Sequence, residues 1–175
     1  MNMKNWEKCI EFHGHSCGGL AIGYKAAEYA KKLLNLTFSQ DEQIVCIAEN
    51  DSCSIDAIQV LLGCSIGKGN LLFHMTGKQA YSFYNRLSGQ SVRLVLNYRS
   101  DKQQKDQIIN DYLNSEPEKL FKITKIKIEL PEKARIFKSY KCEMCGEVTA
   151  SNYIRIQEGK KVCIDCFNSY NRFNI

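Results

Sequence analysis

The residues best suited to chemistry lie in one short stretch near the start of the chain, His13-Gly14-His15-Ser16-Cys17-Gly18-Gly19. In an extended backbone, side chains alternate between two faces, so His13, His15 and Cys17 would point to the same side. The glycines favour an extended or looped backbone over a helix. Imidazole and thiolate are ligands for zinc and other late transition metals. The spacing therefore predicts a metal or catalytic site; the alternative is a tight turn with ordinary buried polar side chains.

Cys53 occupies the same kind of position as Cys17, directly before a predicted helix. Apolar residues recur at helical spacing over residues 20–34 and 55–62, and Gly63 closes the second helix. The positive end of a helix dipole favours a thiolate, so the two cysteines could share one metal ion. Asp56 lies in the first turn of the second helix. It would cap that helix, orient a histidine, or act as an acid/base group beside the metal.

The segment from Gly63 to Asn70 is superficially similar to a phosphate-binding loop. It does not match that motif, because the spacing from Gly63 to Gly67 is one residue too short and Gly69 stands where Ser or Thr should hold magnesium. A Gly-Lys-Gly turn could still direct Lys68 at an anionic substrate. We therefore take Lys68, with Asp56, as a candidate catalytic residue. His74 is expected to pack or to lie at an interface.

A second set of metal ligands lies near the end of the chain. Cys142 and Cys145 form one Cys-x-x-Cys pair, Cys163 and Cys166 form another, and seventeen residues separate the pairs. Two such pairs supply the four thiolates of a tetrahedral zinc site, which predicts a structural Zn²⁺ in a small zinc ribbon. Dithiol redox chemistry is the rival interpretation, but it needs only one pair. A piece this small can scarcely fold without the metal.

Composition narrows the class of protein. The chain has nine cysteines and no signal-peptide-like start, and no apolar run approaches the 18 residues of a membrane helix. These features predict a cytoplasmic protein with reduced thiols and no membrane contact. The net charge is +5, but only about +1 would remain in the C-terminal part once four thiolates bind Zn²⁺. A protein partner for the ribbon is therefore favoured over nucleic acid.

The elements around these sites predict an α+β fold. We expect helices over residues 5–10, 20–34, 55–62, 101–113 and 117–121, and strands over residues 43–48, 71–75, 79–84, 91–98 and 122–130. Hairpins join several strands, so the helices should pack on a largely antiparallel sheet. Pro131 ends the last strand. The expected organisation is a core over residues 1–130, a linker over 131–141 and a zinc ribbon over 142–175. Cys9, Cys46 and Cys64 are expected to pack as small apolar residues.

Three blocks of the sequence, Phe12–Gly19, Asp56–Gln59 and Gly63–Leu71, together resemble the FmdE family, which takes its name from a subunit of formylmethanofuran dehydrogenase. The resemblance covers most of residues 1–130. It implies an α+β core that forms intertwined homodimers and binds a metal at the His/Cys segment, with Cys17 and His15 as ligands. Cys53 as a further ligand is our inference from its position. The ribbon, with Cys145-Gly146-Glu147 and Cys163-Ile164-Asp165-Cys166, resembles the DksA/TraR-type zinc finger.

These features predict a homodimeric metalloprotein with a core transition metal, Zn²⁺ or another, bound by His13, His15, Cys17 and Cys53. Such a protein would be an enzyme or an accessory subunit in one-carbon or molybdenum/tungsten-linked metabolism. The alternative is a metal- or ligand-sensing regulator or adaptor that uses its ribbon to contact another protein. Dehydrogenase activity is not assigned to this chain, because formylmethanofuran oxidation needs molybdopterin and iron–sulfur sites and zinc accounts better for the ribbon cysteines.

Overall fold

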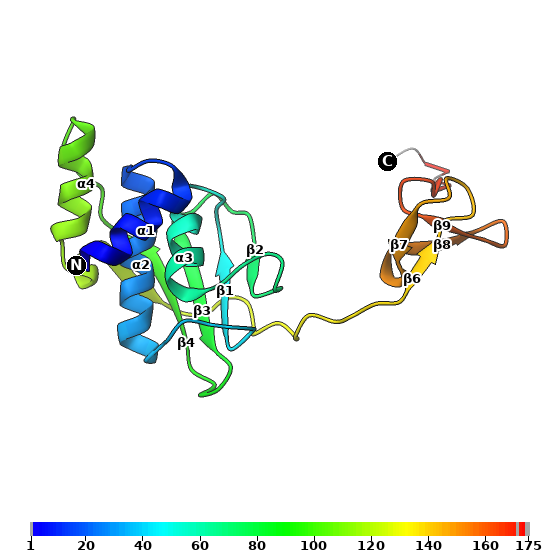
Figure 1. The fold of residues 1–175 in the computed structure, drawn as a ribbon, viewed down its shortest axis with the longest axis horizontal. Helices are drawn as coiled ribbons and strands as arrows, with labels where there is room; N and C mark the ends of the chain where they lie inside the picture. The colour runs from blue at the N-terminus through cyan, green and yellow to red at the C-terminus, as the bar shows by residue number, and fades with distance from the viewer. Residues whose placement is uncertain (1, 171, 174–175) are drawn as a thin grey trace. The chain divides into compact units, whose positions relative to one another are not determined.

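The structure of the chain, a computed structural model, describes residues 2–170 and 172–173. It contains two compact units, Met1–Ala134 and Arg135–Ile175 (Figure 1). No helix among the described residues is long and apolar enough to cross a membrane.

The first unit is built on a five-stranded sheet with the strand order β2-β1-β3-β4-β5. The β1 strand pairs with β2 in parallel, and the other neighbours pair antiparallel. The prediction of a largely antiparallel sheet is therefore confirmed. The strands are β1 (Ile44–Ala48), β2 (Leu71–Phe73), β3 (Ala80–Asn85), β4 (Ser91–Leu96) and β5 (Phe121–Thr124).

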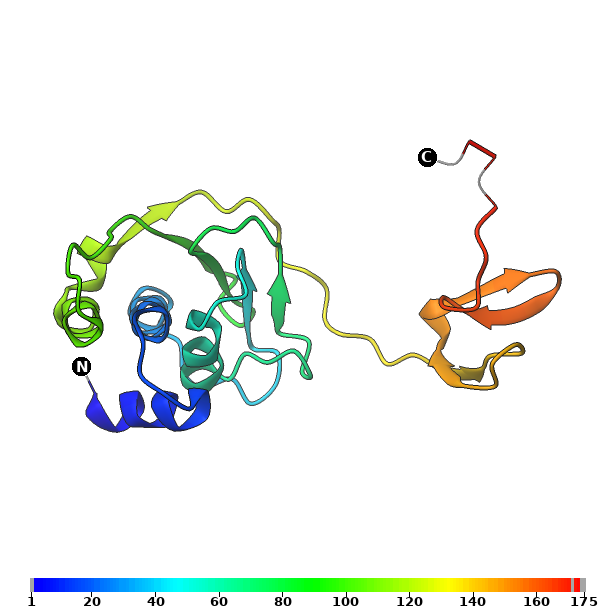
Figure 2. The ribbon, with the colours of Figure 1, turned by 90° about the horizontal axis from the view of Figure 1, so that it is seen from above.

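Helices cover one face of this sheet. Figure 2 shows α1 to α4 on the same side of the curved strands. Apolar side chains from α2 and from alternate positions of the strands, such as Leu20, Phe83 and Leu94, form a buried core between the two layers. The α+β class predicted from the sequence is confirmed. The helices are α1 (Met3–His13), α2 (Gly18–Leu34), α3 (Ser54–Leu62), α4 (Lys105–Asn114) and α5 (Pro117–Leu120).

The other face of the sheet is covered by residues 125–134, which we call the outer segment. A strand was predicted over residues 122–130, but only Phe121–Thr124 pairs with β4. Beyond that point Ile126 and Ile128 pack on the far side of β1 and β3, against a small cluster that includes Val45. The alternation of apolar and charged residues thus reflects packing across a sheet face, not ladder pairing.

Hydrogen bonds hold the outer segment in place along its length. The Tyr84 hydroxyl donates to Ile128 O at 2.5 Å, and Arg86 Nη2 donates to Pro131 O at 2.8 Å. The Ala134 N–H donates to the Glu42 carboxylate at 3.1 Å. Residues 131–134, which were expected in the linker, are therefore held by the first unit.

The second unit consists of two β-hairpins. In the first, β6 (Ser139–Lys141) pairs with β7 (Val148–Ala150); in the second, β8 (Ile154–Gln157) pairs with β9 (Lys160–Cys163). A short 3₁₀ helix, Ser151–Tyr153, joins them. Gly146, with φ of 79°, makes the turn after the first cysteine pair. The buried cluster of this unit contains Val162 and two cysteines, so its apolar core is very small.

Candidate metal centre

The first candidate site lies where the end of α1 meets the start of α2. His13 is the last residue of α1, Gly14 turns the chain with φ of 88°, and Cys17 caps α2 in an extended conformation. The predicted extended backbone was therefore wrong at His13, because a glycine in the left-handed region lets a helix end and reverse within a few residues. The turn still brings the donors of His13, His15 and Cys17 within 4.8 Å of one another.

Within this group, distances fix which atoms face one another. His13 Nε2 lies 3.8 Å from Cys17 Sγ, and the rings of His13 and His15 have centroids 4.5 Å apart. The Leu20 N–H donates to Cys17 Sγ at 3.3 Å, which satisfies one free donor of the first turn of α2. His15 is exposed, whereas His13 and Cys17 are half-buried. The three donors thus converge at the surface, where an ion can enter.

Asp56 orients His13. Its Oδ2 lies 2.6 Å from His13 Nδ1, and its Oδ1 accepts a hydrogen bond from Gln59 Nε2 at 3.2 Å. Since Nδ1 is bonded to the carboxylate, Nε2 is the ring nitrogen left to bind a ligand. A carboxylate behind a histidine is the usual outer shell of a metal site, where it sets the tautomer and the ring orientation.

Cys53 lies beside Cys17. A Cβ placed on Gly19 would be 3.8 Å from Cys53 Sγ and 3.9 Å from Cys17 Sγ, so the bare glycine backbone leaves room for both sulfurs. Burial raises the pKa of the Cys53 thiol, and its hydrogen bond with Cys17 raises it further. Cys53 does not belong to the group of three whose donors all lie within 4.8 Å of one another. It approaches the site from the Cys17 side.

Two features that sequence reasoning missed set the position of Cys53. The first is Gly23 in α2, where a Cβ would lie 1.9 Å from Ser54 O, so only glycine lets α2 pack this closely on the start of α3. The second is a buried polar network under the residues around Cys53. Tyr81 OH donates to Ser54 Oγ at 2.7 Å, and Ser52 Oγ donates to Asn50 Oδ1 at 2.8 Å. A glycine inside a long helical pattern was the available signal for close packing.

Lys68 is not brought together with these residues. Its Nζ donates to Ser39 O at 2.8 Å and lies 5.7 Å from the centroid of the Phe38 ring. The neighbouring Asn70 is fully buried and donates to Ile44 O at 2.9 Å. In this motif, Lys68 and Asn70 therefore hold the loop that leads into β1.

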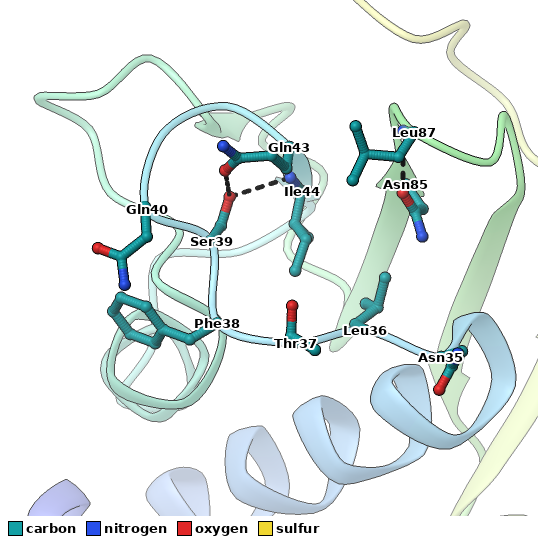
Figure 3. A pocket seen from close by; sticks show the side chains of 10 residues that line it. All are labelled: Asn35, Leu36, Thr37, Phe38, Ser39, Gln40, Gln43, Ile44, Asn85 and Leu87. Atoms are coloured by element: carbon teal, nitrogen blue, oxygen red, sulfur yellow. Dashed lines mark hydrogen bonds between the residues drawn. The ribbon is translucent and has the colours of Figure 1, made fainter.

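A hollow of about 380 Å³ opens beside the candidate site, and His13, Cys53, Asp56 and Phe73 are among the residues that line it. A second hollow, of about 290 Å³, lies at the start of β1 (Figure 3). Its lining combines amides and hydroxyls, such as those of Asn35 and Ser39, with apolar side chains. No charged group, histidine or cysteine is among its ten lining residues. It therefore offers neither a metal ligand nor an acid/base group.

The second candidate site is formed by Cys142, Cys145, Cys163 and Cys166, whose sulfurs all lie within 4.8 Å of one another. Hydrogen bonds from the backbone of Cys145 and Cys163 lower the pKa of the Cys142 thiol to about 6. Neighbouring thiols, those of Cys163 and Cys145 first, raise the pKa of Cys166 to about 12. Four converging sulfurs of this kind fit a tetrahedral Zn²⁺, which would remove the competition for protons among them.

The remaining cysteines and histidine lie outside both groups. Cys9, Cys46 and Cys64 are buried, as expected for packing residues. His74 is exposed.

Comparison with known proteins identifies the family. Residues 12–133, more than half of the chain, match the family described as "FmdE, Molybdenum formylmethanofuran dehydrogenase operon". The chain belongs to the FmdE family. Residues 135–172 match the prokaryotic dksA/traR C4-type zinc finger, so a zinc-binding ribbon follows the FmdE region.

Two relatives add detail. A protein of Archaeoglobus fulgidus named "Probable S-adenosyl-L-methionine-binding protein" is 26% identical over 192 residues, which cover 91% of this chain and 51% of that protein. The chain thus spans about half the length of this curated relative. A crystal structure of an FmdE-like protein of the tungsten formylmethanofuran dehydrogenase type, from Syntrophus aciditrophicus, is similar, with a TM-score of 0.64 and 24% identity. The match covers 94% of this chain and 90% of that one, and it supports the fold.

Proposed function

We propose that the FmdE unit binds a transition metal through His13 Nε2, His15 and Cys17, with Cys53 as a fourth ligand. The observation that carries this proposal is the convergence of three donors at a surface turn, with Asp56 orienting one of them. Imidazole and thiolate suit Zn²⁺ and other late transition metals. An ion bound here would act as a Lewis acid wherever it keeps a position open to substrate.

The role proposed for the chain is that of an enzyme or accessory subunit in one-carbon or molybdenum/tungsten-linked metabolism. This proposal rests on the family and on the hollow beside the site. Of the two catalytic candidates, Asp56 touches His13 and would hold that ligand in place. Lys68 could contact an anionic substrate only after leaving the carbonyl oxygen of Ser39.

Elemental analysis of the full chain, purified without added metal, tests the proposal. We expect two metal ions per chain in the natural protein and one in Cys17→Ser, because the ribbon keeps its zinc. Cys9→Ser is the matched control, since Cys9 is buried away from both donor groups, and it should keep two. Cobalt substitution would then show thiolate charge-transfer bands that weaken in Cys17→Ser. Equal metal content in Cys17→Ser and the natural chain would contradict a core site.

A metal- or ligand-sensing adaptor is the second candidate, and the ribbon surface favours it. Val148, Tyr153 and Ile156 are all more than half exposed, which leaves apolar side chains free to contact another protein. The name of the archaeal relative makes S-adenosyl-L-methionine the first ligand to test. Calorimetry with the metal-loaded chain would measure that binding. Binding to DNA that weakens steeply with salt would instead favour a nucleic-acid partner.

We further propose that the protein is a cytoplasmic homodimer. Phe12, Ile66 and Phe73 are exposed near the candidate site, and covering them would remove apolar surface from water. Light scattering coupled to gel filtration would measure the mass. A mass of one chain at micromolar concentration would contradict the dimer.

A further inference from the structure

Among the described residues of the first unit, Cys17 and Cys53 are the only cysteines that are not buried; the other three, Cys9, Cys46 and Cys64, are. Cys17 and Cys53 begin α2 and α3, and their thiols hydrogen-bond to each other. Both sulfurs lie within 4 Å of the point where a Cβ on Gly19 would stand. Two reachable thiols in contact are the arrangement in which a disulfide forms with little backbone movement.

We propose that Cys17 and Cys53 are a site of reversible oxidation: when no metal is bound in the core, hydrogen peroxide converts this pair into a disulfide that links the starts of α2 and α3.

The surroundings assign a separate role to each sulfur. Cys17 reacts first, because His13 Nε2 lies 3.8 Å from its Sγ and can take the thiol proton. The Leu20 N–H also donates to this sulfur. Cys53 lines the hollow beside the site, touches Cys17 and is therefore the resolving thiol.

The reaction balances with peroxide as the only oxidant. Cys17 Sγ attacks one peroxide oxygen, the O–O bond breaks, and the first water leaves while a sulfenic acid forms on Cys17. Cys53 Sγ then attacks Cys17 Sγ, so the S–S bond forms and the S–O bond breaks. The departing hydroxyl takes the Cys53 proton and leaves as the second water. The two thiols lose two electrons and two protons, and a small thiol reductant reverses the change.

Disulfide formation does not itself depend on the proposed metal. Protection by a metal does rest on the proposed function, because an ion bound to Cys17 would occupy the electron pair that attacks the peroxide. The two ideas can therefore fail separately. The disulfide is tested by which peptides become linked, and the metal by whether added Zn²⁺ prevents the link.

The experiment uses the full chain stripped with EDTA, treated with hydrogen peroxide in the presence or absence of Zn²⁺, and then digested under non-reducing conditions. Without Zn²⁺ we expect one linked pair of peptides that contains Cys17 and Cys53, lighter than the separate peptides by about 2 Da, the mass of two hydrogens. With Zn²⁺ the yield of this pair should fall several-fold. A reducing agent should restore both peptides.

Two variants sharpen the test. In Cys53→Ser the link should be absent and dimedone should trap the sulfenic acid on Cys17, whereas Cys9→Ser should give the link unchanged. Cys17 overoxidised to sulfinic acid while Cys53 stays reduced would overturn the proposal, as would two free thiols after ribbon cysteines have reacted. A Cys17–Cys53 link that forms equally fast with and without Zn²⁺ would uphold the disulfide and count against the core metal.

Discussion

Replacing Gly23 by alanine tests how closely α2 must approach α3. The new Cβ would lie 1.9 Å from Ser54 O, a backbone atom that cannot rotate away. The helices would have to separate by more than about 1 Å to restore ordinary contact. Overpacking of this kind costs about 3 kcal/mol, and the better helix propensity of alanine returns about 1 kcal/mol. We therefore expect a net loss of about 2 kcal/mol in the free energy of unfolding.

Urea unfolding followed by the fluorescence of Trp6 measures this loss. Trp6 is the single tryptophan of the chain, is buried, and meets Tyr24 edge to face, so it reports on the first unit. With a slope of about 2 kcal/mol per M, the midpoint should fall by about 1 M. Gly67→Ala is the matched control, because no atom of the described chain lies within 4 Å of its Cβ position. If both variants unfold at the same urea concentration, the close packing of α2 on α3 is refuted.

Three further predictions follow from the contacts described above. Asp56→Asn should weaken core metal binding by about 10–100-fold in a chelator competition, while Asp51→Asn, an exposed change beside the same hollow, should not; equal affinities would contradict the orienting role. Glu49→Gln should cost about 3–5 kcal/mol, because Arg93 Nε, 2.6 Å from Glu49 Oε1, would stay buried without its partner. The Arg93 hydrogen bond lowers the pKa of Glu49 below its ordinary 4.5, so the pair stabilises the fold above that pH and the stability is lost as the pH falls through the lower folded value; acid unfolding of Glu49→Gln should show a shallower pH dependence over this range, and an identical curve would contradict the assignment. Cys145→Ser should remove one zinc and the amide dispersion of the second unit in NMR spectra while leaving Trp6 fluorescence unchanged, and a changed Trp6 signal would refute the independence of the two units.

Most elements of the fold could be predicted because their periodicity and end signals agree. In α3, apolar spacing and the left-handed Gly63 mark the same helix that the structure contains. The outer segment could not be predicted, because a period of two describes any extended chain lying on a sheet face. Only the absence of pairing partners after Thr124, within the described part of the chain, separates it from a strand.

The candidate site could be predicted in its residues but not in its backbone. The glycines around His13 suggested an extended stretch, although the helix that starts at Met3 continues to His13 and ends only there. The matching positions of Cys17 and Cys53 before two helices indicated a shared site, and the structure places them in contact. Their role as metal ligands stays a prediction. The function of Gly23 could not be read locally, because it depends on a carbonyl group more than thirty residues away.

The outer segment decides where the two units can be separated by protein engineering. A chain cut after Thr124 would lose the cover over Val45 and would strand a buried carboxylate, that of Glu42, without the amide it now accepts. Exposing a single side chain of this kind costs about 1.5–3 kcal/mol, a large part of the stability of a small domain. A cut after Ala134 avoids both losses. The ten residues after β5 therefore belong to the folding unit that precedes them, and ribbons are best exchanged at Arg135.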